Sequence, residues 1–237
     1  NTSSDLYGYD DVLMNFIKLY ESGNFPKVSL VTGEKGIGKF TLVFHFIIYI
    51  FSKYYKQPYD LDKKSIDESN LILSKFNSKT FQNFVYFPNE DKNKLSIEKV
   101  REIKKDLNNS TLDNNPRFIV FDDVELLNNN VVNSLLKMIE EPSNNNYFIL
   151  VNNKRNKLVE TLKSRSIETK IFLNSDQKNS ILKKILDNHD IDDNFILNYS
   201  YLASPGMFIK YYYILRETGA ELDTPFYELT SKLLEKY

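Results

Sequence analysis

The sequence predicts an α/β protein whose parallel sheet is covered by helices on both faces, followed by a smaller all-helical domain. Between residues 28 and 151, short apolar runs typical of buried parallel strands alternate with segments whose apolar residues recur at helical spacing. Beyond Phe172 the helical spacing continues without strands between the helices. Strands that alternate with helices form a parallel sheet with crossover helices. We therefore expect an α/β domain at residues 1–172 and a small helical domain at residues 173–237.

Each expected element has its own local signal. Apolar runs such as R-F-I-V-F predict strands, apolar residues three to four apart predict helices, and Ser96 is a suitable N-cap. The segment at residues 52–79 is largely polar and stays unplaced, apart from weak helical spacing at residues 71–76. Expected strands are 28–31, 81–87, 117–121 and 147–151; expected helices are 11–20, 41–51, 97–107, 130–141, 178–187, 193–202, 206–216 and 222–237.

Composition excludes several classes of function. The formal net charge of −1 and the pI near 6.2 give no basic field of the kind that a freestanding nucleic-acid binder uses. The chain has no cysteine and two histidines, which argues against disulfides, thiolate zinc sites and histidine metal clusters. The most apolar run, residues 41–51, is about half as long as a membrane span. We expect a cytoplasmic protein without a metal and without a membrane partner.

A glycine-rich loop follows the first expected strand. Residues 33–41 read G-E-K-G-I-G-K-F-T, and the phosphate-binding pattern is G-x-x-x-x-G-K-[ST]. Gly33, Gly38 and Lys39 fall at the required places, but Phe40 stands where a hydroxyl would ligate Mg²⁺. Thr41 is adjacent, although one helical residue rotates a side chain by about 100°. The candidate nucleotide-binding residues are Gly33, Gly36, Gly38, Lys39, Thr41 and Asp122.

An acidic pair follows the strand at residues 117–121. Asp122 occupies the place of the acid that lies near the metal in P-loop nucleotide sites. Asp123 stands where hydrolysing relatives carry a glutamate that polarises water, and it is one methylene shorter. Acids also end strands for reasons of turn geometry, so the pair alone is a weak signal.

Several stretches taken together resemble a known family. They are G-E-K-G-I-G-K-F-T, S-I-E-K-V-R-E-I, F-D-D-V-E-L-L-N, N-S-L-L-K-M-I-E-E-P, Y-F-I-L-V-N-N and L-K-S-R-S, in this order. The sequence thereby resembles the AAA+ clamp-loader subunits of bacterial DNA polymerase III, most closely the delta-prime type. The resemblance covers residues 7–166 and, more loosely, residues 203–209. It implies an AAA+ P-loop sheet, a helical lid domain, and a collar domain that we expect to be missing after Tyr237.

The resemblance also implies roles for single residues. Its S-R-C motif supplies an arginine to ATP held by the neighbouring subunit, and here S-R-S places Arg165 in that role. In the family, a residue at the end of the strand that reads Y-F-I-L-V here contacts the phosphate as a sensor. This position corresponds to Asn152 or Asn153. The family's second sensor motif reads S-P-G-M, so Met207 stands where ATP-binding members carry a cation. The four-cysteine zinc module of many relatives is absent from the sequence.

Three hypotheses follow from these residues. The first is an assembly subunit that does not hydrolyse ATP, because Phe40, Asp123 and Met207 each replace a different catalytic part. The second is an active ATPase whose magnesium ligand is replaced from elsewhere, and the third is a P-loop kinase or an unrelated binding module. Under the first hypothesis no cofactor is required, although weak ATP binding stays open because Lys39 and the loop amides are intact. Its partners are gamma/tau-like and delta-like loader subunits, with the sliding clamp and primer-template DNA reached through the assembled complex.

Overall fold

The computed structural model describes residues 4–88, 96–108, 115–142, 145–189 and 204–219. The chain forms two compact units. One unit comprises Asn1–Glu34 and Lys39–Ile171, and the other comprises Lys35–Gly38 and Phe172–Tyr237. The tip of the glycine loop therefore belongs to the same unit as the helices that follow Phe172.

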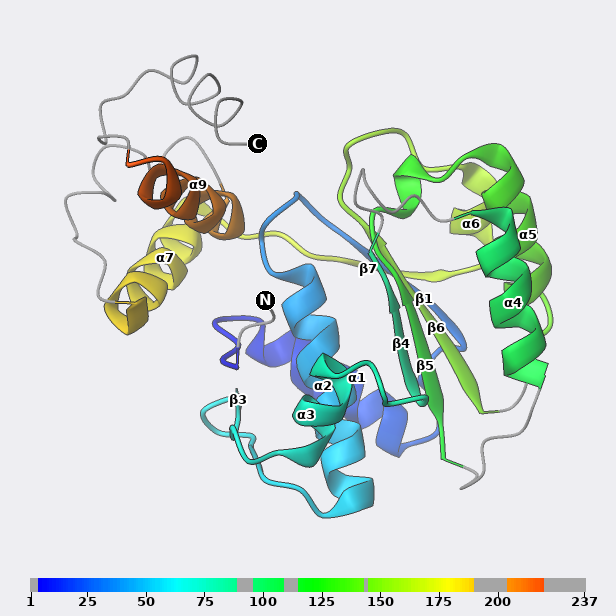
Figure 1. Cartoon of the computed structure of the whole chain (residues 1–237), viewed down its shortest axis with the longest axis horizontal. Helices are drawn as coiled ribbons and strands as arrows, with labels where there is room; N and C mark the ends of the chain where they lie inside the picture. Colours follow the sequence, from blue (N-terminus) through cyan, green and yellow to red (C-terminus); the bar gives the residue numbers. More distant parts are fainter. Residues whose placement is uncertain (1–3, 89–95, 109–114, 143–144, 190–203, 220–237) are drawn as a thin grey trace. The chain divides into compact units, whose positions relative to one another are not determined.

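The first unit is built on a parallel sheet of five strands in the order β4-β5-β6-β1-β7 (Figure 1). Every neighbouring pair in this sheet is parallel. The result confirms the predicted fold class. The strands are β1 (Val28–Thr32), β4 (Phe84–Phe87), β5 (Arg117–Phe121), β6 (Asn146–Asn152) and β7 (Ile167–Lys170); a separate antiparallel pair joins β2 (Tyr59–Asp60) to β3 (Ser65–Ile66).

Helices cover both faces of the sheet (Figure 1). One face carries α1 (Asp10–Glu21), α2 (Lys39–Tyr55) and α3 (Leu71–Asn77), and the other carries α4 (Ile97–Asn108), α5 (Asn129–Ile139) and α6 (Glu160–Ser164). A short 3₁₀ helix, η1 (Val124–Leu126), joins β5 to α5. The described helices of the second unit are α7 (Ser175–His189) and α9 (Pro205–Thr218). Among the described residues, no helix has both the length and the apolar character needed to cross a membrane.

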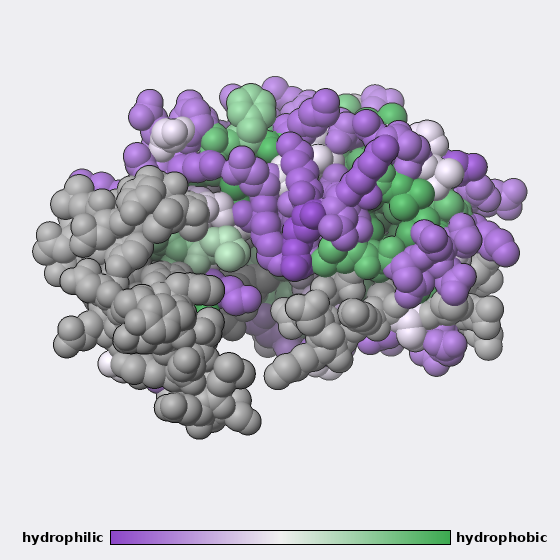
Figure 2. All heavy atoms as spheres, turned by 90° about the horizontal axis from the view of Figure 1, so that it is seen from above, coloured by the Kyte–Doolittle hydropathy of each residue, from purple (hydrophilic) through white to green (hydrophobic). Residues whose placement is uncertain are grey.

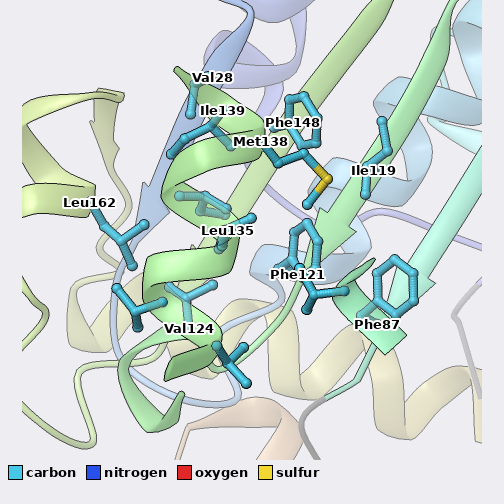
Figure 3. Packing of buried hydrophobic residues seen from close by; sticks show 14 of the residues in the cluster. Val28, Phe87, Ile119, Phe121, Val124, Leu135, Met138, Ile139, Phe148 and Leu162 are labelled. Atoms are coloured by element: carbon cyan, nitrogen blue, oxygen red, sulfur yellow. The ribbon is translucent and has the colours of Figure 1, made fainter. Parts of the chain in front are cut away.

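Two apolar cores fix the sheet between its helices. On the α2 side, aromatic rings pack edge to face, with Phe46 and Phe51 each against Phe118 at centroid distances of 5.7 and 5.8 Å. On the other side, apolar residues of α5 and α6 pack against the strands, as Figure 3 shows for Leu135 and Leu162. Both of these leucines are fully buried. The two cores hold the strand ends in place, and the candidate site lies at those ends.

The sequence signals located most elements but not all of them. The helix expected at residues 41–51 begins earlier, at Lys39, and the strand expected from residue 81 begins only at Phe84. Ser96 caps α4 as predicted, since Lys99 N donates to Ser96 Oγ at 3.2 Å. The short elements α6, β2, β3 and β7 were not expected. The helices expected at residues 193–202 and 222–237 lie outside the described residues.

Most of the coloured surface in Figure 2 is hydrophilic, with apolar side chains exposed in smaller areas. This agrees with the charged fraction of 27% in the sequence. The most exposed large apolar side chains of the described residues are Phe172, at 80%, and Ile167, at 63%. Ile167 begins the edge strand β7, and Phe172 begins the segment that continues into the second unit.

Candidate functional site

The candidate site lies at the carboxyl edge of the parallel sheet. Because the strands are parallel, the loop after β1, the acids after β5 and the asparagine after β6 all emerge at the same edge. Tyr86, near the end of β4, joins them through its side chain. The fold therefore brings together the loop lysine, Asp122, Asp123 and Asn153.

The glycine loop is held by bonds within its own chain. Gly33 N donates to Asn152 O at 3.1 Å, which ties the start of the loop to β6. Gly36 and Gly38 have φ of 81° and 91°, a conformation that favours glycine. Lys39 Nζ donates to Gly33 O at 2.8 Å and to Glu34 O at 2.5 Å, so this ammonium group bonds to carbonyls of the loop.

Lys39 is almost completely buried, with 2% of its surface exposed. Burial lowers the pKa of Lys39 to about 8, because removal from water disfavours the charged form. The negative charges of Asp122 and Glu125 act in the opposite direction and do not offset the burial. Lys39 thus lies in the electrostatic field of the acids that follow β5.

The tip of the loop is packed against the start of α9, inside the second unit. Gly206 N donates to Gly36 O at 2.8 Å, and Ser204 Oγ donates to Lys35 O at 2.5 Å. A Cβ atom on Gly206 would lie 2.8 Å from Gly36 O, and one on Gly36 would lie 2.2 Å from Ser204 Oγ. The Cβ atom on Gly36 would also lie 3.0 Å from Met207 N. The two backbones are therefore in direct contact, and the S-P-G-M segment reaches the loop.

An aromatic pair occupies the position next to Lys39. The rings of Phe40 and Tyr86 are stacked, with centroids 4.0 Å apart and an interplanar angle of 29°. The hydroxyl of Tyr86 donates to Asp122 Oδ2 at 3.1 Å. Phe40, at the start of α2, is thereby connected to the acid after β5 through one tyrosine side chain.

Both acids after β5 are engaged by neighbouring residues. Asn153 Nδ2 donates to Asp122 Oδ1 at 2.9 Å and to Asp123 Oδ1 at 2.6 Å. Asp122 Oδ1 also accepts from Asp123 N at 2.8 Å, and Arg155 forms an ion pair with Asp123 at 3.7 Å. Of the two candidate sensor residues, Asn153 contacts the acids. The Oδ1 of Asn152 instead accepts from Lys154 N.

Burial raises the pKa of Asp122 above its ordinary value. The charge of Asp123 acts in the same direction. Hydrogen bonds from Asp123 N, Asn153 and Tyr86 favour the ionised form and reduce the shift. These donors therefore offset part of the effect of burial on the carboxyl group of Asp122.

Glu125 fixes the segment that carries Asn153. Its Oε1 accepts from the backbone N–H groups of Asn153 and Arg155, at 3.1 Å each. Its Oε2 is buried without a hydrogen-bond partner among the described residues. Glu125 belongs to η1, three residues after Asp122. It therefore connects the loop after β5 to the loop after β6.

The residues at this edge do not fit a magnesium ion that would bridge the loop and the acid. Mg²⁺ requires oxygen ligands in near-octahedral geometry, and Phe40 supplies none. Asp122 uses both of its oxygens for hydrogen bonds within the chain. Within that same part of the chain, no group of three or more His, Cys, Asp or Glu side chains is placed to hold a metal ion.

Arg165 lies at the opposite edge of the sheet. It directly follows α6, one residue (Ser166) separates it from β7, and β7 runs parallel to β1. Ser29 pairs with Ile167, so the start of β7 lies at the edge where β1 begins, whereas the glycine loop follows the end of β1. A strand advances about 3.3 Å per residue, so the length of β1 separates Arg165 from the loop. The structure does not bring Arg165 to the loop of its own chain.

Tyr86 and Glu125, which connect neighbouring loops of this site, were missed in the sequence. Tyr86 lies in the run F-Q-N-F-V-Y-F, where it resembles the core aromatics around it, and only the parallel pairing of β4 with β5 brings it to Asp122. Glu125 had a weak signal in F-D-D-V-E, as the one acid that follows the pair inside an apolar stretch. Neither residue could be assigned without knowing which strands are neighbours.

Comparison with known proteins decides the family. Residues 8–176 match the family described as "DNA polymerase III, delta subunit". This match covers more than half of the chain. The chain belongs to this family. The resemblance deduced from the G-E-K-G-I-G-K-F-T, F-D-D-V-E-L-L-N and S-R-S stretches is thereby confirmed.

Individual relatives agree with the family. The DNA polymerase III subunit delta' of Buchnera aphidicola subsp. Acyrthosiphon pisum is 27% identical over 166 residues, which cover 69% of this chain and 48% of that protein. The subunit delta' of Escherichia coli K12 is 33% identical over 78 residues, which cover 33% of this chain and 23% of that protein. The chain spans less than half the length of the curated relatives that it matches.

Solved structures agree with the fold. One variant of Thermotoga maritima RuvB has a TM-score of 0.53 at 15% identity, over 99% of this chain and 73% of that chain. A second variant has a TM-score of 0.52 at 17% identity, over 97% and 69%. At these identities the similarity concerns the α/β fold alone.

Proposed function

We propose that this chain is part of a DNA polymerase III clamp-loader subunit that does not hydrolyse ATP itself and gives Arg165 to ATP held by a neighbouring subunit. Membership of the delta-subunit family supports the place in the loader. The AAA+ fold supports a role in a ring of related subunits, where the site of one subunit faces the surface of the next. In this proposal Arg165 is the residue that acts on the neighbour's ATP.

The position of Arg165 carries the proposal. Arg165 lies at the amino edge of the sheet, whereas Lys39 and Asp122 belong to the carboxyl edge. Its side chain is 40% exposed, so it is accessible to another molecule. An arginine that is accessible and lies at the edge of the sheet opposite its own loop suits a phosphate on a neighbouring subunit. Its planar guanidinium can bind phosphate through two parallel N–H donors.

The chain's own loop supports the absence of hydrolysis. Phe40 stacks on Tyr86 where a magnesium ligand would be, and Lys39 donates to loop carbonyls. Asp123 is bonded to Asn153 and paired with Arg155. Phosphoryl transfer depends on a placed metal and an oriented nucleophile, and these residues supply neither. In this proposal the subunit requires no cofactor of its own. Because the loop amides are intact, weak binding of ATP by this subunit is an outcome to be tested.

The partners follow from the family. The subunit assembles with gamma/tau-like and delta-like loader subunits in the cytoplasm. The sliding clamp and primer-template DNA are reached through the assembled complex, which agrees with the net charge of −1 and the lack of a basic field on this chain. We propose no membrane partner.

An active ATPase is the second candidate, and one observation favours it. Gly36, Gly38 and Lys39 keep the residue types of a phosphate loop, and the two glycines have positive φ angles. A phosphate-release assay on the full-length protein separates the two candidates. Turnover that Lys39→Ala abolishes would establish the ATPase.

Replacement of Arg165 in the assembled loader tests the proposal. Arginines that act in this way are worth roughly 10³ to 10⁵ in rate at their own site. Because the other sites of the ring keep their own arginines, we expect Arg165→Ala to lower total DNA-stimulated turnover by only a few-fold while assembly and ATP affinity are retained. Arg165→Lys should rescue poorly, since an ammonium group cannot replace the planar fork. Equal clamp-loading rates with wild type, Ala and Lys would refute the role.

A further inference from the structure

The guanidinium group of Arg165 is already held by its own chain. Arg165 Nε donates to Glu140 Oε1 at 3.0 Å, and Arg165 Nη1 donates to Thr161 O at 3.3 Å. Glu140 is the C-cap of α5, and Arg165 is the C-cap of α6. The two partners thus come from helix ends that are 25 residues apart in the sequence.

The core places these two helix ends firmly. Ile139, which directly precedes Glu140, is buried, and so is Met138. Leu162, in the helix that precedes Arg165, is fully buried in the same apolar cluster, and Figure 3 shows Leu162, Met138 and Ile139 around α5. Neither helix end can shift without disturbing the cluster. The distance between the Glu140 and Arg165 backbones is therefore fixed by packing.

The geometry of the contact leaves the outer part of the guanidinium available. A guanidinium has five N–H donors, one on Nε and two on each terminal nitrogen. Glu140 uses the inner donor on Nε, and Thr161 uses one donor on Nη1. The three other donors of Arg165 have no partner among the described residues. They include a terminal pair of the kind that binds phosphate in a fork.

We propose that Glu140 is a positioning residue for Arg165: it holds the guanidinium through Nε and leaves the terminal nitrogens for a neighbour's phosphate. This inference rests on the proposed trans-acting function of Arg165. Arginine has a large rotamer entropy, and a donor that must be ordered during the reaction stabilises the transition state less than one that is already placed. Glu140 keeps Arg165 ordered before the neighbour arrives.

Two other roles for Glu140 predict different effects of its removal on turnover. If the carboxylate competes with phosphate for the guanidinium, its removal increases turnover. If the contact is an ordinary exposed ion pair, its removal changes nothing, since the two side chains are 40% and 47% exposed and such pairs contribute little. Only a positioning role predicts a loss of turnover that depends on the presence of Arg165.

The experiment is a double-mutant cycle in the loader assembled with full-length subunits. We expect Glu140→Ala to lower the Arg165-dependent part of DNA-stimulated turnover by several-fold to roughly 10²-fold, the cost of a misplaced catalytic group. The KM for ATP should stay unchanged, because ATP is held by the neighbour. In the Arg165→Ala background, Glu140→Ala should cause no further loss. Glu140→Gln should restore much of the turnover, because its amide oxygen still accepts from Nε.

Glu141→Ala is the matched control, because Glu141 is the adjacent exposed acid and makes no hydrogen bond or ion pair among the described residues. It should leave turnover unchanged. If Arg165→Ala lowers turnover but Glu140→Ala does not, or Glu140→Ala raises it, the positioning role is refuted and the proposed function stands. If Glu140→Ala lowers turnover equally with and without Arg165, its role is structural and the inference is again refuted. If Arg165→Ala itself has no effect, the proposed function fails and the inference fails with it.

Discussion

Tyr86 stacks on Phe40 and places its hydroxyl on Asp122. The loop after β1 and the acid after β5, which a metal would connect in an ATPase, are connected here by two aromatic rings and one hydrogen bond. We therefore predict that a single substitution in the glycine loop is insufficient to rebuild a nucleotide site. The contact also gives Phe40 a structural role of its own.

Phe40→Thr restores the hydroxyl that the loop pattern requires. We predict that the full-length variant still releases no phosphate from ATP above a no-protein control, because Asp123 and Met207 are unchanged and Asp122 stays engaged by Asn153. Loss of the stacked pair should lower the free energy of unfolding by about 1 kcal/mol. Phosphate release and urea unfolding measure the two effects, with Phe40→Tyr as the variant that keeps a ring. Hydrolysis by the Thr variant that Lys39→Ala removes would contradict the prediction.

Gly36→Ala tests the contact between the loop tip and the start of α9. Alanine at a positive φ costs roughly 1–2 kcal/mol wherever it occurs. At Gly36 the new Cβ also meets Ser204 Oγ and Met207 N, which should add roughly 1–3 kcal/mol of steric strain. Gly23→Ala is the matched control, because Gly23 has φ of 73° with nothing within 4 Å of its Cβ position. Urea unfolding should show a larger loss for Gly36→Ala. Equal losses for the two variants would mean that the loop tip does not pack against α9.

The lowered pKa of Lys39 predicts a dependence of stability on pH. Lys39 releases its proton near pH 8 in the folded chain, against an ordinary lysine value of 10.5. Between these values the unfolded chain binds more protons at this site, so this residue's contribution to stability rises with pH. The unfolding free energy of wild type minus that of Lys39→Met should therefore increase from about pH 8 to 10.5. Below pH 8 this difference should stay constant.

Urea unfolding at a series of pH values measures this difference. Lys137→Met, which replaces an exposed lysine of α5, is the control. A Lys39→Met difference that stays constant across the alkaline range would show that Lys39 keeps its ordinary pKa in the folded chain.

The sequence predicted the fold wherever an element carries its own signal. The buried run R-F-I-V-F with the acids after it identified β5 and one part of the site, and G-E-K-G-I-G-K identified the loop. Strand β7 escaped detection because I-E-T-K, at the edge of the sheet, is largely exposed and lacks an apolar run. Helix α6 has five residues, too few to display helical spacing.

The contacts that decide the chemistry depend on neighbours in space. Tyr86 reaches Asp122 because β4 pairs with β5, and Gly206 reaches Gly36 across 170 positions of sequence. Glu140 meets Arg165 because α5 and α6 share one apolar core. Local patterns contain no information on such pairs. The family resemblance suggested roles for single residues, and the fold was needed to see what each one contacts.

The most direct measurement of the central claim compares two alanine substitutions in the assembled loader. DNA-stimulated ATP turnover and clamp loading are measured with the full-length subunit carrying either Lys39→Ala or Arg165→Ala, after assembly of each ring has been verified. We predict that Lys39→Ala leaves both rates at the wild-type level, because the loop of this subunit does no chemistry. Arg165→Ala should lower both rates, because a neighbour's site loses its arginine. A loss with Lys39→Ala together with wild-type rates for Arg165→Ala would contradict the claim and establish this subunit as an ATPase in its own right.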